Sequence, residues 1–206
     1  MTNKNAALAS FAVVFLSACG GGSTGSVPFS QTPNPPQTTP VSPQATFENR
    51  VSRGIALIES FEAAGQTTDM PTSGTAQYRG VAGFSDVKDF DQADIFVTSD
   101  VAMTASFTAS GGTISGELSN FIVKDDENTF IPISGSLAMA SAGISGATFS
   151  STVSGTLVGE GETVPVTGQV NGQFRGTDAA GIGAEIALFD AAANETLYGA
   201  GVLERQ

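Results

Sequence analysis

The sequence predicts an all-β fold: an eight-stranded antiparallel up-and-down β-barrel with one N-terminal helix, preceded by a disordered tether. After Pro71, apolar residues alternate with Thr, Ser and other polar residues, as in strands with one buried face. The turns between these runs are short, which makes neighbouring strands antiparallel. The chain also holds 25 glycines, many inside the runs, which suits the bends of a small closed barrel. A two-sheet sandwich is the alternative.

The first residues have the pattern of a secretory signal. A basic start at Lys4 precedes an apolar run of about 11 residues, which is too short for a membrane-spanning helix of about 20. The run ends in Leu16–Cys19, and Cys19 is the only cysteine of the chain. Lipidation explains a lone cysteine in an oxidising compartment. We therefore expect a signal peptide over residues 1–18 and a lipid anchor at Cys19.

Leu16–Cys19 resembles the lipobox of bacterial lipoproteins, in which the cysteine carries fatty acyl chains such as palmitate and becomes the new N-terminus. The alternative is an ordinary signal-peptide cysteine with cleavage elsewhere. In this class an acidic residue just after the cysteine retains the protein at the inner membrane. Gly20 and Gly21 stand there instead, so the resemblance implies the bacterial outer membrane, at the cell surface or on the periplasmic face.

Residues 19–45 form the expected tether. This segment has no charged residue, and it contains six of the nine prolines. Such a composition cannot bury enough apolar surface to offset the entropy of ordering. We expect an extended spacer that reaches at most about 75 Å, at roughly 3.1 Å per residue.

Residues 46–69 are predicted to form a helix with a lead-in to the barrel. Apolar residues recur there every three or four positions, which indicates one helical stripe: Phe47, Val51, Ile55, Ile58 and Phe61. Thr46 is the expected N-cap, and Gly65 suits the position after the last turn. We expect the stripe to pack against an end or flank of the barrel, with partner binding as the alternative.

The barrel is predicted over residues 70–206, with its first strand within Thr75–Phe84. The next seven strands are indicated by these apolar positions: Val101, Met103, Ala105 and Phe107; Ile114, Gly116, Leu118 and Ile122; Ile131, Ile133, Gly135, Leu137 and Met139; Ala147, Phe149, Val153, Gly155 and Leu157; Val164, Val166, Val170 and Phe174; Ile182, Ala184, Ile186 and Leu188; Tyr198, Ala200 and Val202. The opposite face is mostly Thr and Ser, and the chain has no Trp and two Tyr. Since an outer-membrane barrel needs a lipid-facing apolar band with aromatic girdles, we expect a filled barrel surrounded by water.

The formal net charge is −12, and all 20 acidic residues lie after residue 45. This charge repels nucleic acid and anionic membrane surfaces, so we expect no nucleic-acid partner. It favours a cationic partner or simply solubility.

Catalytic chemistry is poorly represented. The chain has no histidine and no cysteine besides Cys19, which excludes Ser-His-Asp and Cys-His catalysis, the usual zinc sites and His-ligated haem. Carboxylates gather in two connections: Asp86, Asp89, Asp91 and Asp94 in one, and Asp125, Asp126 and Glu127, with Asn128, in the other. Oxygen-rich loops can bind calcium, but neither run has the spacing of a calcium loop, which favours solvated turns. We predict no catalytic residue, no cofactor and no metal site.

Three stretches together resemble the barrel domain of transferrin-binding-protein-B-like surface lipoproteins. Met70–Gly80 resembles its opening strand, and Phe107 with Gly112–Gly116 resembles its second hairpin. Gly172–Ala179 is similar to its most characteristic stretch, a Gly-x-Phe-x-Gly turn that leads to Ala. Gly199–Val202 matches the closing strand.

This resemblance, over about Met70 to Arg205, implies an eight-stranded barrel on a lipoprotein that binds at the cell surface. Members that bind transferrin have two lobes, whereas this chain has room for one barrel and a helix. The expected function is therefore an outer-membrane lipoprotein, most simply a monomer, that binds a protein or a small solute. The alternative is a structural envelope lipoprotein without a diffusible ligand, and an enzyme is not expected.

Overall fold

The computed structural model describes residues 41–87, 93, 95–159, 161–191 and 193–206. The predicted signal peptide, Cys19 and most of the tether lie outside these residues. The described part holds one α-helix, a short 3-10 turn (Thr177–Ala179) and eight strands. In chain order they are α1 (Pro43–Ala64), β1 (Gly74–Ser85), β2 (Phe96–Thr108), β3 (Gly111–Lys124), β4 (Phe130–Ser145), β5 (Thr148–Gly159), β6 (Glu162–Arg175), β7 (Gly181–Asp190) and β8 (Glu195–Arg205).

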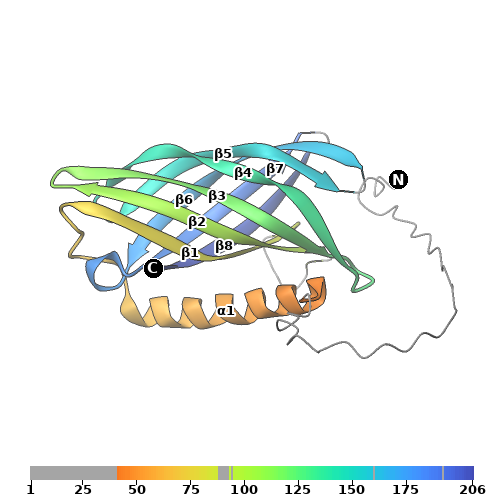
Figure 1. The fold of residues 1–206 in the computed structure, drawn as a ribbon, viewed down its shortest axis with the longest axis horizontal. Helices are drawn as coiled ribbons and strands as arrows, with labels where there is room; N and C mark the ends of the chain where they lie inside the picture. The colour runs from red at the N-terminus through yellow and green to blue at the C-terminus, as the bar shows by residue number, and fades with distance from the viewer. Residues whose placement is uncertain (1–40, 88–92, 94, 160, 192) are drawn as a thin grey trace, which may run out of the picture. The chain divides into compact units, whose positions relative to one another are not determined.

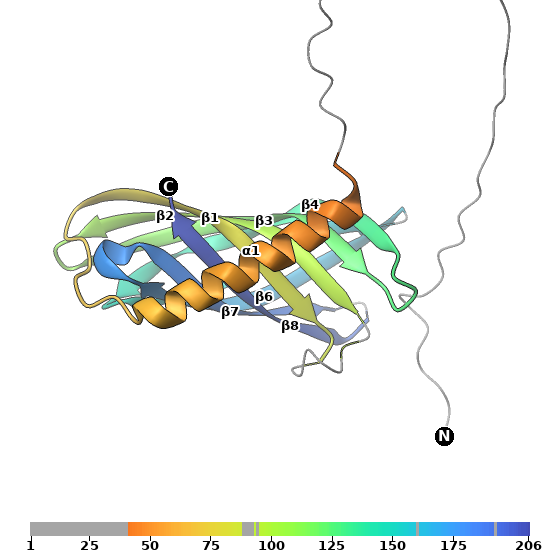
Figure 2. The ribbon, with the colours of Figure 1, turned by 90° about the horizontal axis from the view of Figure 1, so that it is seen from below.

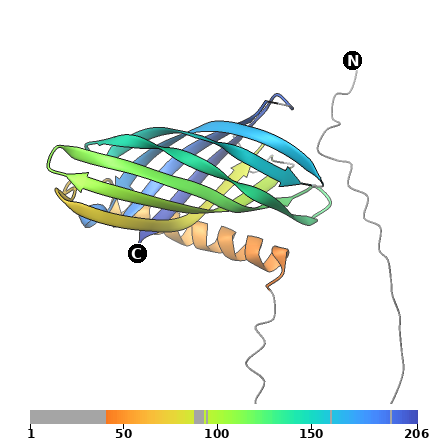
Figure 3. The ribbon, with the colours of Figure 1, turned by 45° about the horizontal axis from the view of Figure 1, so that its top comes forward.

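The strands form a closed barrel, and each pairs antiparallel with its neighbour in the sequence (Figure 1). Pairing of β1 with β8 closes the barrel, with Tyr78 opposite Arg205 and Ser85 opposite Tyr198. The up-and-down barrel predicted from the alternation is confirmed, and the sandwich alternative is excluded. Helix α1 lies outside the barrel and crosses its wall diagonally (Figures 2 and 3).

The start of α1 differs from the prediction. Ser42, and not Thr46, is the N-cap, because its hydroxyl accepts a hydrogen bond from the amide of Ala45 at 3.1 Å. Pro43 fits the first helical position, where its missing N–H is not needed and its fixed φ is already helical. The end of α1 agrees with the prediction, since Gly65 has φ 70° and donates its N–H to the carbonyl of Phe61. No described helix is long and apolar enough to cross a membrane.

The barrel interior is filled by side chains, and Phe174 lies within it. Its ring meets those of Tyr78, Phe107 and Phe149 edge-on, with centroids 5.9, 5.7 and 5.8 Å apart. Phe174 and Val170 are fully buried on the inner face of β6. The prediction that Phe174 is a core residue is confirmed.

On two strands, the side chains that face the interior differ from the prediction. On β3, the pairing register shifts between Ser119 and Phe121, so Phe121 joins the core in place of Ile122. This bulge contains Asn120, whose φ of 55° is left-handed. On β8 the inward positions include Leu203, which lies opposite Gly80 of β1 and belongs to the core, and Gly199, which lies opposite Phe84. Leu197, on the same side of the strand, is partly buried and packs against that core.

Tyr198, Ala200 and Val202 therefore lie on the outer side of β8, and their predicted inward orientation was wrong. Both sides of β8 carry apolar residues, so alternation alone could not distinguish them. Val202 is 8% exposed although it lies outside the interior cluster. Helix α1 contacts β8 on this outer side, which is why an outward valine is buried.

Candidate binding surface

Helix α1 approaches the barrel closely at two glycines. A Cβ atom on Gly54 of the helix would lie 3.4 Å from Cγ2 of Val81 on β1. A Cβ atom on Gly181 of β7 would lie 2.1 Å from the ring of Phe61, so the ring occupies the space that any larger residue needs. At the other end of α1, the Phe47 ring packs edge-on against Phe130 of β4, with centroids 5.2 Å apart.

The middle of α1 is fixed by a buried arginine. Arg50 is 7% exposed, and its Nε and Nη2 atoms lie 2.9 and 2.8 Å from the two carboxylate oxygens of Asp100 on β2. Its Nη1 donates to the carbonyl of Asn120 at 2.7 Å, and the side-chain amide of Asn120 donates to Asp100 at 2.9 Å. The bulge on β3 thus presents a carbonyl that a guanidinium on the helix reaches. Planar bidentate contacts of this kind suit arginine and not lysine.

These contacts of Arg50 determine which side of α1 the barrel covers. The barrel covers Phe47, Arg50, Gly54 and Phe61, whereas Val51, Ile55 and Ile58 are 42, 54 and 41% exposed. The prediction that the whole apolar stripe packs on the barrel was wrong for these three residues. No sequence pattern pointed to Arg50, since a charged residue on a helix is usually solvated.

A groove of about 700 Å³ lies along the C-terminal half of α1. The helix forms one wall through Ile58, Phe61 and Glu62, and the outer faces of β5 to β8 form much of the rest. The polar side chains that line it include Arg175, Glu185, Asn171, Gln173, Ser150 and Thr148. Several floor positions are Gly or Ala, so the strand backbone is accessible. A groove with an aromatic and aliphatic wall, amides and both signs of charge can bind a ligand but has no evident reaction chemistry.

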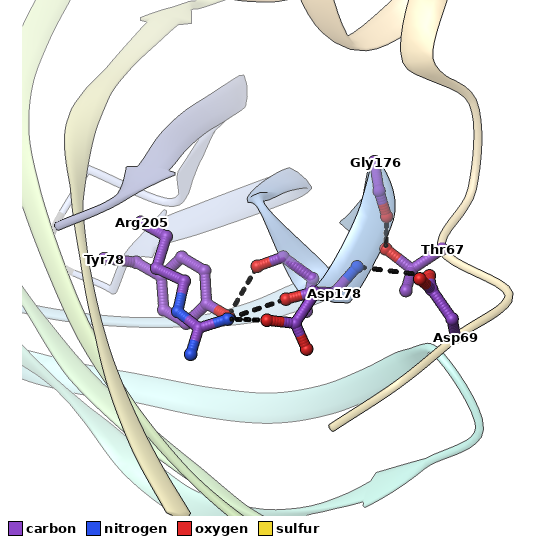
Figure 4. Close-up of polar contacts among 7 residues, drawn as sticks. Thr67, Asp69, Tyr78, Gly176, Asp178 and Arg205 are labelled. Carbon is purple, nitrogen blue, oxygen red and sulfur yellow. Dashed lines mark hydrogen bonds and ion pairs between the residues drawn. The ribbon is translucent and has the colours of Figure 1, made fainter.

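One end of the barrel is closed by the connection between β6 and β7 (Figure 4). Asp178 and Ala179 both have φ 53°, and hydrogen bonds hold this left-handed turn. The hydroxyl of the interior Tyr78 donates to the carbonyl of Ala179 at 2.8 Å, and Arg205 donates from Nη1 to the carbonyl and carboxylate of Asp178, both at 2.8 Å. The Asp178 amide donates to Asp69 at 3.1 Å.

Thr67 completes this closure. Its hydroxyl donates to the carbonyl of Gly176 at 2.7 Å, and its amide donates to the carbonyl of Phe174. Burial raises the pKa of Tyr78 from 10.0 to about 12, an effect that Arg205 opposes and Asp178 reinforces. Tyr78 is therefore a hydrogen-bond donor at neutral pH, and the arrangement is a structural cap.

The two acidic connections are placed only in part. Asp89, Asp91 and Asp94 lie outside the described residues. Asp86 follows β1, and one of its carboxylate oxygens is buried and has no hydrogen-bond partner among the described residues. In the other connection, Asp125 accepts a hydrogen bond from the amide of Thr129 at 2.7 Å and so closes its own turn. In the described residues, no group of three or more acidic side chains could hold a metal ion.

The described part is thus an eight-stranded antiparallel barrel with a helix seated on its outer wall and a groove beside the helix. Residues 70–202 match the family model of the C-lobe and N-lobe β-barrels of transferrin-binding protein B. Because the match covers more than half of the chain, the protein belongs to this family. The predicted resemblance is confirmed.

Among solved structures, the chain is similar to a variant of transferrin-binding protein B, a vaccine antigen from Haemophilus parasuis, with 20% identity and a TM-score of 0.41 over 66% of this chain and 27% of that one. For transferrin-binding protein B of Neisseria meningitidis the identity is 18% and the TM-score 0.41, over 66% and 26%. For intact Ap-TbpB, with its N and C lobes, they are 18% and 0.44, over 68% and 28%. The chain thus spans less than a third of each of these proteins. No curated protein matches it.

Proposed function

We propose that the protein is an outer-membrane lipoprotein, anchored through Cys19, which binds a protein or a small solute on the outer surface of its barrel. The observation that carries the proposal is membership of a family of barrels from transferrin-binding protein B. The groove beside α1 supports it, because it offers a hollow on the outer wall while the interior is filled by side chains. Transferrin itself is not proposed as the ligand, because the chain spans so little of the proteins named for it.

The anchor is tested by fractionating cells that produce the full chain. We expect the protein in the outer-membrane fraction, with a mass increased by acyl chains. Cys19→Ser should remove the added mass and release the protein, whereas Ser17→Ala, which keeps a small residue before the cysteine, should behave like the natural chain. A Cys19→Ser chain that stays in the membrane fraction would show that something else holds it there.

The binding role is tested by capture. The full chain in its native membrane is exposed to a panel of extracellular and envelope proteins and small solutes. One saturable partner with a Kd of about 1 μM or lower, roughly −8 kcal/mol, supports the binding role. A blank result across the panel would favour the structural alternative.

A further inference from the structure

Helix α1 presents an uncovered apolar stripe. Val51, Ile55 and Ile58 follow one another at spacings of four and three, so they share one side of the helix. All three are more than 40% exposed. Single exposed aliphatic residues are common on soluble proteins, but a contiguous set bordered by polar residues is typical of an interaction surface.

The stripe runs into the groove. Ile58 belongs to both, and Glu62, the next residue on that side of the helix, also lines the groove. Phe61 forms the base of the same wall, where its ring is fixed over Gly181. The exposed stripe and the groove therefore make one elongated surface, named here the α1 flank.

The α1 flank is acidic. Glu48, Glu59 and Glu62 are exposed on the helix and Glu185 is exposed in the groove, and none forms an ion pair with another described residue. The two arginines of the helix are held by carboxylates of the barrel. Among the described residues, Arg175 is the one cation that lines the groove. Four carboxylates against one guanidinium favour a positively charged occupant.

We propose that the α1 flank binds a cationic amphipathic helix of a partner protein. Apolar anchors spaced by three and four residues would pack on Val51, Ile55 and Ile58, and Lys or Arg beside them would meet the glutamates. A second copy fits poorly, because a two-fold contact would bring these carboxylates together. An anionic lipid surface is repelled for the same reason. The proposal rests on the binding role above and adds to it a surface and a partner chemistry.

The test uses the full chain in phosphatidylcholine discs, with empty discs as the baseline. The probe is a labelled 18-residue peptide with Leu at helical three-and-four spacing, flanked by Lys. We expect saturable binding that weakens as salt is added. Ile55→Ser and Ile58→Ser should each weaken it at least tenfold, and Glu62→Gln a few-fold. Ala56→Ser is the matched control: it adds a hydroxyl at an exposed neighbouring position that faces elsewhere on the helix, and should leave binding unchanged.

A second peptide has the same composition with its leucines out of helical phase. Equal binding of this peptide, or unchanged binding to Ile55→Ser with an unaltered melting temperature, would overturn the proposal. A dimer that Ile55→Ser abolishes would assign the surface to a second copy and overturn it too. If the panel yields a partner that Ile55→Ser binds as tightly as the natural chain, the α1 flank is wrong while the binding role stands.

Discussion

Inside the barrel, Phe174 packs edge-on against three aromatic rings, whereas on the outer wall α1 is held in the middle by Arg50, Asp100 and Asn120. The inner contacts follow from alternation along each strand, which is a local property. The outer contacts depend on an ion pair and a bulge, which no local pattern announces. The interior therefore supplies most of the free energy of unfolding. The contacts of Arg50 determine where the helix lies and which of its sides stays exposed. Four substitutions separate these roles.

The largest loss of stability is expected for Phe174→Ala. Truncating a buried Phe costs about 3–5 kcal/mol, a large part of the roughly 5–15 kcal/mol that stabilises a domain. Here it would also remove three edge-on ring contacts. Urea unfolding followed by circular dichroism measures the loss. A loss below about 1 kcal/mol would mean that the interior repacks freely and that the aromatic cluster is not the centre of the core.

Next comes Arg50→Met, which keeps an unbranched apolar stem and removes the guanidinium with its charge and its donors. Hydrogen bonds to charged groups contribute about 1.5–3 kcal/mol each. Because the Asp100 side chain is 46% exposed, water replaces the lost guanidinium and offsets much of this contribution. We therefore expect the free energy of unfolding to fall by about 2 kcal/mol. Arg53→Met is the control: its ion pair with Glu204 is about half exposed on both sides, so less than about 1 kcal/mol is expected. Equal losses in the two variants would contradict the special role of the Arg50 site.

A smaller effect is expected for Tyr78→Phe, about 1 kcal/mol at neutral pH, because the carbonyl of Ala179 loses its donor. The pH dependence carries a sharper signature. Since the folded pKa is raised to about 12 from 10.0, the contribution of Tyr78 is complete below pH 10 and falls as the pH rises through 12. Unfolding measured across this alkaline range should be less pH-dependent for Tyr78→Phe. The same slope in both chains would contradict the assignment.

The smallest effect is expected one residue after Phe174. Arg175 lines the outer groove and has no ion pair with another described residue, so Arg175→Ala should change stability by less than about 0.5 kcal/mol. A large loss here beside a small one for Phe174→Ala would reverse the two faces of β6. Thermal melts of the two variants, recorded together, decide between these outcomes.

The same contrast explains what the sequence could predict. The barrel and the burial of Phe174 were predictable, because alternation and short turns are encoded locally. The side of α1 that packs on the barrel was not predictable. Hydrophobicity favoured contact through Val51, Ile55 and Ile58, whereas Arg50 and Gly54 contact the barrel wall. An ion pair across the fold and a close approach at a glycine leave no periodic signal. The inserted residue Asn120 likewise moved Ile122 off the inner face.

The pairing of β1 with β8 has a consequence for how the chain folds. Every other pair of strands is a hairpin of sequence neighbours, but this closure joins the two ends of the domain. Contacts between distant residues form late, so we expect closure to be the slow step of refolding. Until then β1 and β8 are unpaired edges that can join other chains. Because α1 contacts β1 through Gly54 and β8 through Arg53, it can bring these edges together and shorten the time in which the chain is prone to aggregate.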